Sequence, residues 1–383
     1  MKKILLITSG YLPLPPIKGG AVEVLTQNYL EKNEQLKKAK FVVYSYGESI
    51  QPTKKYANTE YRFIKINKLL DLVFKVAQKS TKNRSPDYFL YRIKKDINKR
   101  NEQFDIALVE NKPKSVIYTK RKICNNVVLH AHNDWFGNQS KEICESCTKV
   151  ITVSNYLGIA IRRRTSAGKI VTVFNAVDER QFKKKNSAIV SKIKDDLGIK
   201  KKDLVFLYTG KIKPEKGTLE LIQAFNKINS EHAKLILVGS SFSMDTNDND
   251  YVKKAKSIAS TNKNILFTGF VEYNDVSRYY SIADVQIVPS QSEDSCPLTA
   301  IEGIDAGLAQ IVSDSGGIPE IVKGTKAIVV KRGPGFVEEL QKAICSLIND
   351  KDKIDTMKKS SLAQSKRFKS DDFCKKMLKE ITE

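Results

Sequence analysis

One carboxylate before a short predicted helix and a second within it form a pattern suited to binding a phosphorylated sugar. Asp294 and Glu302 have seven residues between them, and Glu293 is the alternative first acid. The expected first turn of the helix is Pro297, Leu298 and Thr299. Backbone N–H groups at a helix N-terminus bind phosphate, and carboxylates accept hydrogen bonds from sugar hydroxyls. The segment therefore predicts a nucleotide-sugar site, although the acids of an ordinary strand–helix–strand unit could merely cap helices.

A glycine turn followed by lysines forms a second candidate phosphate site. Gly210 and Lys211 follow a predicted strand, and Lys216 and Gly217 precede a predicted helix. Glycine lets the backbone approach a ligand closely, and each lysine ammonium group can neutralise phosphate charge. This pattern favours a diphosphate ligand, with a lysine-rich surface turn as the alternative.

The first half of the chain contributes two further candidates. Gly19 and Gly20 join the first predicted strand to the first predicted helix, but they do not form the G-x-G-x-x-G of dinucleotide-binding proteins. His130 and His132 stand at the end of a predicted strand, where histidines are often structural. Neither histidine has an obvious Ser or Cys partner, which argues against a nucleophilic triad.

No motif in the sequence predicts a metal site or a resident cofactor. Cys144 and Cys147 form a C-x-x-C pair without a second pair at zinc-ligand spacing. Asp248 and Asp250 lie in a polar run that lacks the glycine and final Glu of a calcium loop. We expect no metal, and a nucleotide-sugar as co-substrate in place of a cofactor.

The elements that must position these residues are short strands alternating with helices along the whole 383-residue chain. This alternation predicts an α/β fold with one parallel sheet in each half. We expect a first domain over residues 1–185, a second over 186–365 and a helical tail over about 366–383. No apolar run approaches about 20 residues, so no membrane-spanning helix is expected.

Together, these motifs resemble the donor site of family-4 glycosyltransferases, which are retaining enzymes of the GT-B fold. The family pattern Gly-Arg-x-x-x-x-Lys-Gly is matched from Gly210 to Gly217, with Lys211 in place of Arg. A Gly-Gly-x-x-Glu loop follows at residues 316–320. The resemblance implies two Rossmann-like domains facing across a cleft, with the last helix crossing back to the first domain. The first domain would bind the acceptor and the second the nucleotide-sugar.

The resemblance also implies roles for individual residues. Lys211 and Lys216 would stabilise the departing nucleoside diphosphate, and Asp294 would hold the sugar hydroxyls. Glu302 would hold the ribose, and His132, with His130 as the alternative, would contact the donor sugar. The other implied donor contacts are Gly19, Gly20, Gly210, Glu293, Pro297, Leu298 and Thr299. The implied reaction is a metal-independent hexosyl transfer with retention, and UDP is the expected nucleotide.

Positive charge is concentrated in the first half of the chain. Residues 1–185 contain 36 Lys+Arg and 16 Asp+Glu, whereas residues 186–383 contain 30 and 27. Such a field attracts a polyanion or an anionic membrane surface, although a lysine-rich organism would also have many basic residues. Residues 67–103 are expected to be helical, with an apolar face that either packs in the core or lies on a membrane. That face is Leu69, Leu70, Val73, Phe74 and Ala77.

We therefore expect a cytoplasmic glycosyltransferase that acts on a saccharide or lipid-diphosphate-linked acceptor in capsule, exopolysaccharide or cell-wall glycan synthesis. A peripheral position at the inner face of the cell membrane would follow if the basic surface binds lipid. One alternative is a non-catalytic relative that supports a partner transferase. Another is a basic nucleic-acid-binding protein, which the absence of a recognition motif disfavours.

Overall fold

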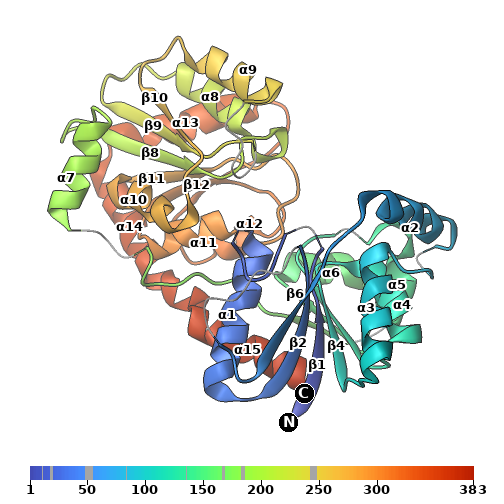
Figure 1. The fold of residues 1–383 in the computed structure, drawn as a ribbon. Coiled ribbons are helices and arrows are strands. Elements are labelled where there is room, and N and C mark those ends of the chain that lie inside the picture. The colour runs from blue at the N-terminus through green and yellow to red at the C-terminus, as the bar shows by residue number, and fades with distance from the viewer. Residues whose placement is uncertain are drawn as a thin grey trace. The chain divides into compact units, whose positions relative to one another are not determined.

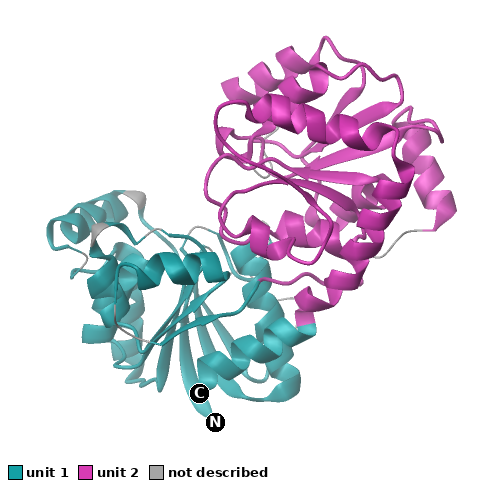
Figure 2. Cartoon of the chain, turned by 180° about the vertical axis from the view of Figure 1, so that it is seen from behind, with its two compact units in different colours: residues 1–174, 371–383 teal, residues 175–370 magenta. Residues whose placement is uncertain are grey.

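The computed structural model describes residues 1–10, 12–17, 20–47, 55–82, 84–134, 136–165, 169–182, 186–241 and 248–383, without the side chains of Lys68 and Asn138. Gly19 lies outside the described residues. The chain divides into unit 1, residues 1–174 and 371–383, and unit 2, residues 175–370 (Figure 2). The two boundaries were expected after residues 185 and 365, and the structure places them after 174 and 370.

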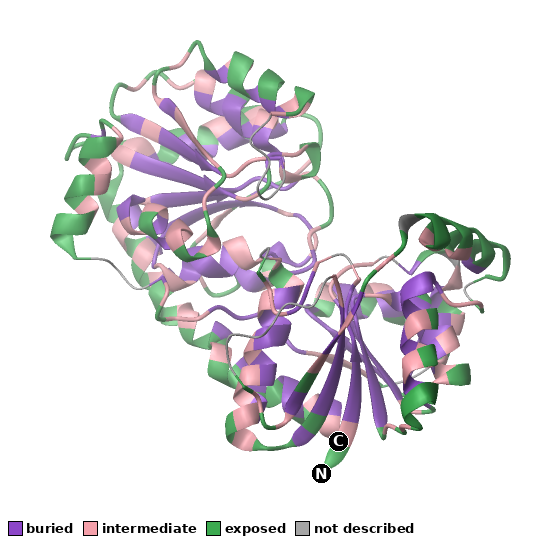
Figure 3. Cartoon of the chain, viewed as in Figure 1, coloured by how far each residue is buried: buried purple, intermediate pink, exposed green. Residues whose placement is uncertain are grey.

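Unit 1 is built on a seven-stranded parallel sheet with the strand order β3-β2-β1-β4-β5-β6-β7. The central strands consist mainly of Ile, Leu and Val and are buried on both faces, as parallel strands covered by helices must be (Figure 3). The strands are β1 Lys2–Ile7, β2 Ala39–Tyr46, β3 Thr59–Ile64, β4 Ile106–Glu110, β5 Val127–Ala131, β6 Lys149–Thr152 and β7 Lys169–Thr172.

The helices of unit 1 cover both faces of this sheet, with α1 and α15 on one side and α3, α4 and α5 on the other (Figure 1). Lys149 Nζ lies 3.0 Å from Glu380 Oε2 and ties the C-terminal helix α15 to β6. The helices are α1 Ala21–Leu36, α2 Lys68–Ser80, α3 Tyr88–Arg100, α4 Val116–Lys122, α5 Ser140–Glu145, α6 Asn155–Arg162 and α15 Ser370–Thr382, with 3-10 turns η1 Pro113–Ser115 and η2 Gly137–Gln139.

The stretch 67–103, expected to be one helical segment, is interrupted. The helices α2 and α3 are separate, and the Asp87 side chain caps α3 by accepting a hydrogen bond from Leu90 N at 2.8 Å. The expected apolar face of α2 is also wrong in one residue, because Phe74 packs inward on α3 while Leu69 and Val73 are exposed. Within the described chain, no helix has both the length and the apolar content needed to cross a membrane.

Unit 2 contains a six-stranded parallel sheet with the order β10-β9-β8-β11-β12-β13. The strands are β8 Leu204–Thr209, β9 Ala233–Val238, β10 Ile265–Gly269, β11 Val285–Val288, β12 Ala309–Ser313 and β13 Ile328–Val330. The helices are α7 Ser187–Asp196, α8 Thr218–Asn226, α9 Asp250–Ala259, α10 Tyr273–Ile282, α11 Leu298–Asp305, α12 Ile318–Ile321, α13 Phe336–Ile348 and α14 Lys351–Ser365, with 3-10 turns η3 Pro214–Lys216 and η4 Lys366–Phe368. Helices α8, α9 and α13 cover one face of the sheet, and α10, α11 and α14 the other (Figure 1).

Both sheets reverse their strand order at one point, between β1 and β4 in unit 1 and between β8 and β11 in unit 2. In open parallel sheets, ligands bind beside the carboxyl ends of the strands at such a point, because the loops diverge there. The expected fold class of two parallel-sheet α/β domains is confirmed. The loops after β8 and β11, together with helix α11, contain most of the predicted donor-binding residues.

Candidate functional site

The loop after β8 is held against the loop after β11 by glycine and backbone contacts. Gly217 has a φ of 70°, and a Cβ atom there would lie 1.9 Å from the carbonyl oxygen of Pro289. Only glycine fits such a position. The backbone N–H of Gln291 also donates to the carbonyl of Glu215 at 2.9 Å. These contacts fix the place of Lys216 between Glu215 and Gly217.

Lys216 and Asp294 form an ion pair, so the structure brings together two predicted site residues that are far apart in the sequence. The exposed fractions of their side chains are 39% and 18%, which leaves the pair accessible to a ligand. The backbone of Asp294 accepts a hydrogen bond from Gly317 N at 2.9 Å and donates one to Ser315 Oγ at 3.0 Å. Three loops, after β8, β11 and β12, therefore meet at Asp294.

Glu293 points to a different partner. Its carboxylate lies 2.7 Å from Arg332 Nη2 and accepts a hydrogen bond from Gly316 N at 2.6 Å. Arg332 also binds Asp314 at 3.1 Å and was not recognised in the sequence. Arg332 lies two residues after β13, at the carboxyl end of a parallel strand, and this position could have marked it as a site residue. Of the two alternative acids, Asp294 is the one that contacts the lysine.

Helix α11 begins at Leu298, with Pro297 as a cap residue that provides no side-chain hydrogen bond. The first N–H groups of a helix have no acceptor within the helix and carry partial positive charge. The predicted contacts Leu298 and Thr299 therefore lie in a first turn that can bind an anion.

Two buried glutamines hold α11 on the sheet. Gln286 Nε2 on β11 donates to the carbonyl of Thr299 at 2.8 Å, and Gln310 Nε2 on β12 donates to that of Ala300 at 2.9 Å. Gly303 makes this approach possible, because a Cβ there would lie 1.8 Å from Gln286 Oε1. The sequence signal was a glutamine as the second residue of each apolar strand.

Glu302, the predicted ribose contact, is almost fully enclosed, with 3% of its surface exposed. Its carboxylate accepts a hydrogen bond from Tyr280 OH at 2.7 Å, and Tyr280 OH lies 2.6 Å from Thr209 Oγ1. Burial raises the pKa of Glu302 to about 7, against the lowering effect of hydrogen bonds from Tyr280 and Tyr273. The carboxyl group therefore titrates near neutral pH.

The remaining predicted residues of the two glycine loops are positioned mainly by the backbone. Gly210 has a φ of 138°, and the following residue, Lys211, is exposed and accepts a hydrogen bond from Tyr208 OH on its carbonyl at 2.7 Å. Gly20 has a φ of 107° and immediately precedes α1. A Cβ at Gly20 would lie 2.3 Å from the carboxylate of the buried Glu23.

His130 and His132 of unit 1 belong to a buried network around Glu110. His130 Nδ1 lies 2.9 Å from Glu110 Oε2 and 3.2 Å from His132 Nε2, and Tyr29 OH donates to Glu110 Oε1 at 2.6 Å. Glu110 is the last residue of β4, His130 lies in β5 and His132 follows β5 directly. Because β4 and β5 are neighbouring parallel strands, all three side chains lie at one edge of the sheet. Glu110 was not predicted from the sequence, although a charged residue that ends an apolar strand was a usable signal.

The charges of this network are set by burial and by its own members. Burial would raise the pKa of Glu110, but the two imidazoles outweigh it and hold that pKa below its ordinary value. Burial, together with the neighbouring His130, lowers the pKa of His132 to about 4. His132 is therefore neutral near pH 7 and acts as a hydrogen-bonding group rather than as a cation.

These three side chains are also a possible metal-binding set within the described residues, because their ligand atoms lie within 4.8 Å of one another. Two imidazoles and a carboxylate suit a transition metal. The distances of 2.9 and 3.2 Å are equally those of hydrogen bonds, which explain the cluster without an ion.

Comparison with known proteins shows which family this chain resembles. The family model described as "Glycosyl transferases group 1" matches residues 190–364, which is most of unit 2. In this segment the chain is similar to the group 1 glycosyltransferases. Spore coat protein SA of Bacillus subtilis is 28% identical over 343 residues, which cover 85% of this chain and 84% of that protein. A lipopolysaccharide 1,2-N-acetylglucosaminetransferase of Salmonella typhimurium is 30% identical over 51% of each chain.

Solved structures with the GT-B fold match the whole chain. Anabaena HepE in complex with UDP matches 100% of both chains with a TM-score of 0.74 at 18% identity. The sucrose-phosphate synthase of Thermosynechococcus elongatus matches 99% of this chain and 98% of its own with a TM-score of 0.78 at 18% identity. At this level of identity the likeness establishes the fold alone.

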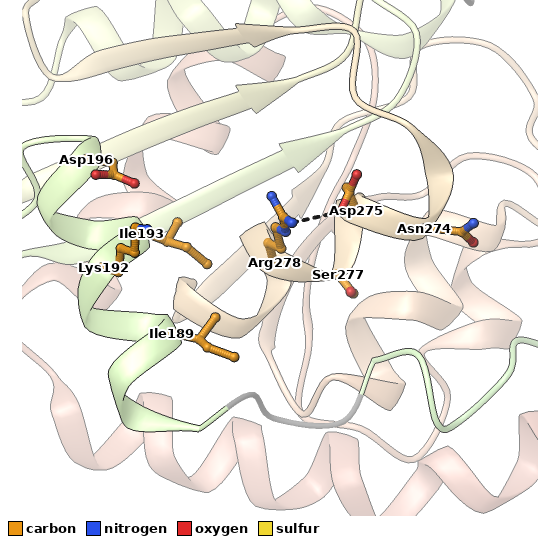
Figure 4. Close-up of a pocket in the computed structure, with 8 residues that line it drawn as sticks. All are labelled: Ile189, Lys192, Ile193, Asp196, Asn274, Asp275, Ser277 and Arg278. Carbon is orange, nitrogen blue, oxygen red and sulfur yellow. Dashed lines mark ion pairs between the residues drawn. The ribbon is translucent and has the colours of Figure 1, made fainter.

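A pocket of 470 Å³ lies elsewhere in unit 2, between α7 and α10 (Figure 4). Arg278 and Asp275 form an ion pair at 3.2 Å on its α10 side, and Ile189 and Ile193 line its α7 side. The predicted donor contacts do not line this pocket. We therefore base the function on the loops after β8, β11 and β12.

Proposed function

We propose that the protein is a retaining, metal-independent glycosyltransferase that transfers a hexosyl group from UDP-sugar to a saccharide or lipid-linked saccharide. The observation that supports this most strongly is the accessible ion pair between Lys216 and Asp294, in the loops that also lead to the N-terminus of α11. A lysine and a helix N-terminus are two groups that favour a bound diphosphate.

The ion pair suggests how the donor binds. In the free protein, the Asp294 carboxylate neutralises Lys216. A diphosphate that takes over the lysine would release the carboxylate, which could then accept hydrogen bonds from the hydroxyls of the donor sugar. A single exchange of ion-pair partners would thus bind the diphosphate leaving group to Lys216 and the sugar hydroxyls to Asp294.

The same groups would supply most of the catalysis. Departure of the nucleoside diphosphate leaves an oxocarbenium-like centre on the sugar, and stabilising the departing negative charge usually contributes most to the rate enhancement. In this proposal Lys216, Lys211 and the first turn of α11 stabilise that charge. Loss of one such contact should raise the barrier by about 3 kcal/mol. Retention would follow from attack on the face that the leaving group vacates, without a covalent protein nucleophile.

His132 is proposed to contact the donor sugar as a neutral hydrogen-bonding group. Its pKa of about 4 leaves it uncharged at pH 7. Glu110 and Tyr29 would fix the orientation of the pair of histidines through the hydrogen bonds described above. In this role Glu110 is a positioning residue, since it acts through the imidazoles.

UDP and the acceptor class are supported by the names of similar proteins and by the charge of the chain. Anabaena HepE was solved with UDP-glucose, and the Salmonella relative is named a lipopolysaccharide 1,2-N-acetylglucosaminetransferase. On this basis we propose polysaccharide assembly, such as capsule, exopolysaccharide or cell-wall glycan synthesis, on the cytoplasmic side of the membrane. The rival is a non-catalytic relative that supports a partner transferase, since spore coat protein SA is named for the coat and not for a reaction.

A thermal-shift screen with UDP-, dTDP- and GDP-sugars tests the donor. A ligand at 100 times its dissociation constant should stabilise the fold by about 2.7 kcal/mol. We expect stabilisation by UDP-sugars and hydrolysis or transfer in a nucleotide-release assay, with release lost in Lys216→Ala. Binding without turnover with any saccharide acceptor would favour the non-catalytic alternative, and no stabilisation by any nucleotide-sugar would contradict the proposal.

A further inference from the structure

Helix α2 of unit 1 presents its apolar face to solvent. Leu69, Leu72, Val73 and Val76 have exposed fractions of 78, 63, 63 and 64%. Their spacing of i, i+3, i+4 and i+7 places them in one stripe along the helix. A helix that covers a core turns such a stripe inward, and α2 does the opposite, as its exposed colour in Figure 3 shows.

The opposite side of α2 fixes this orientation. The ring of Phe74 packs on α3, with its centroid 5.5 Å from that of Tyr88 and 5.0 Å from that of Tyr91. Gln78, one turn further along this side, is buried. The Asn67 side chain caps the helix by accepting a hydrogen bond from Leu69 N at 3.0 Å. The apolar stripe therefore cannot turn inward without breaking an aromatic cluster.

The surroundings of the stripe are strongly basic. Residues 65–84 contain six Lys+Arg and one acidic residue, Asp71. Asp71 pairs with Lys75 at 2.6 Å, and the side chain of Lys75 remains 64% exposed. Lys79 is also exposed. An amphipathic helix with an apolar face and flanking lysines has the properties of helices that lie in the interface of an anionic membrane.

We propose that α2 docks on an anionic lipid bilayer, with Leu69, Leu72, Val73 and Val76 at the boundary between headgroups and acyl chains. Charge complementarity selects this occupant over a second copy of the chain, because pairing two copies through α2 would bring two basic clusters together. The docking site is separate from the donor site and does not depend on the proposed transfer reaction.

Vesicle binding of the full chain tests the proposal. Sedimentation with large unilamellar vesicles of phosphatidylcholine, with or without 30 mol% phosphatidylglycerol, should show binding only to the anionic vesicles. Replacing the four stripe residues by Gln keeps the charge and the helix propensity. This variant should bind more than tenfold more weakly. Lys75→Gln with Lys79→Gln should weaken binding by about fivefold per lysine removed.

A matched control is Lys253→Gln with Lys254→Gln, which removes the same charge from two exposed lysines on α9, one of them paired with an acid of its own helix. This control should bind vesicles like the wild type. A second readout places an environment-sensitive fluorophore at Val73→Cys in a Cys345→Ser background, since Cys345 is the exposed cysteine among the described residues. Its emission should shift to the blue only with anionic vesicles.

Three results would overturn the proposal. The first is wild-type protein that does not bind anionic vesicles. The second is a stripe variant that binds as well as the wild type, which would show charge adsorption without apolar insertion. The third is a dimer in vesicle-free solution that the stripe variant abolishes, which would assign the stripe to a second copy of the chain.

Discussion

The buried carboxyl group of Glu302 makes a quantitative prediction about stability and pH. Its pKa in the folded protein is raised to about 7 from an ordinary value of 4.5. The folded state therefore holds this proton more tightly than the unfolded state, so stability falls as the pH rises through this interval. For these two values, the loss between pH 5 and pH 8 is about 2–3 kcal/mol. Glu302→Gln keeps an oxygen acceptor for Tyr280 and removes the titrating group.

Calorimetric or urea unfolding at pH 5 and pH 8 measures this effect. Relative to the wild type, Glu302→Gln should gain about 2–3 kcal/mol of unfolding free energy on going from pH 5 to pH 8, because only the wild type must ionise a buried group. The control is Glu339→Gln, which removes an exposed carboxylate on α13. A difference between Glu302→Gln and wild type that is the same at both pH values would show that this carboxyl group titrates normally, and would refute the argument from burial.

One further substitution in each unit tests its packing, Gly303→Ala in unit 2 and Glu110→Gln in unit 1. Gly303→Ala places a methyl group 1.8 Å from Gln286 Oε1 and should lower the free energy of unfolding by about 3 kcal/mol, whereas Gly158→Ala, with 3.3 Å to its nearest neighbour, should change it by less than about 1 kcal/mol. Glu110→Gln weakens charged hydrogen bonds to Tyr29 and His130 and should cost about 2–3 kcal/mol in urea unfolding at pH 7. Because the folded pKa of Glu110 is lowered, this deficit should shrink as the pH falls below about 5.

The donor-side loops could be predicted from the sequence because their signals are local. The loops after β8 and β12 each combine an apolar strand end, a glycine and a charged residue within a few positions, and the loop after β11 follows an apolar strand with two adjacent acids. Since the strands are parallel, their carboxyl ends share one sheet edge, and this alone brings Lys216 close to Asp294. The expected architecture and the proximity of Lys216 to Asp294 both follow from the parallel arrangement of the strands.

The partners of the site could not be predicted because they come from distant strands and helices. Arg332 reaches Glu293 from beyond β13, and Tyr280 reaches Glu302 from α10. The burial of Glu302 depends on how closely α11 approaches the sheet, which Gly303 decides. The pattern of α2 was equally compatible with a core helix, and the direction of its apolar face depends on where Phe74 finds aromatic partners.

The central claim is that Lys216 receives the diphosphate of the donor, and titration calorimetry with UDP and with uridine tests it most directly. For Lys216→Gln, we predict UDP binding at least tenfold weaker than in wild type, since hydrogen bonds to charged groups contribute about 1.5–3 kcal/mol. Uridine, which lacks phosphate, should bind both proteins equally, and Lys253→Gln should match the wild type. Equal affinity of wild type and Lys216→Gln for UDP would contradict the account.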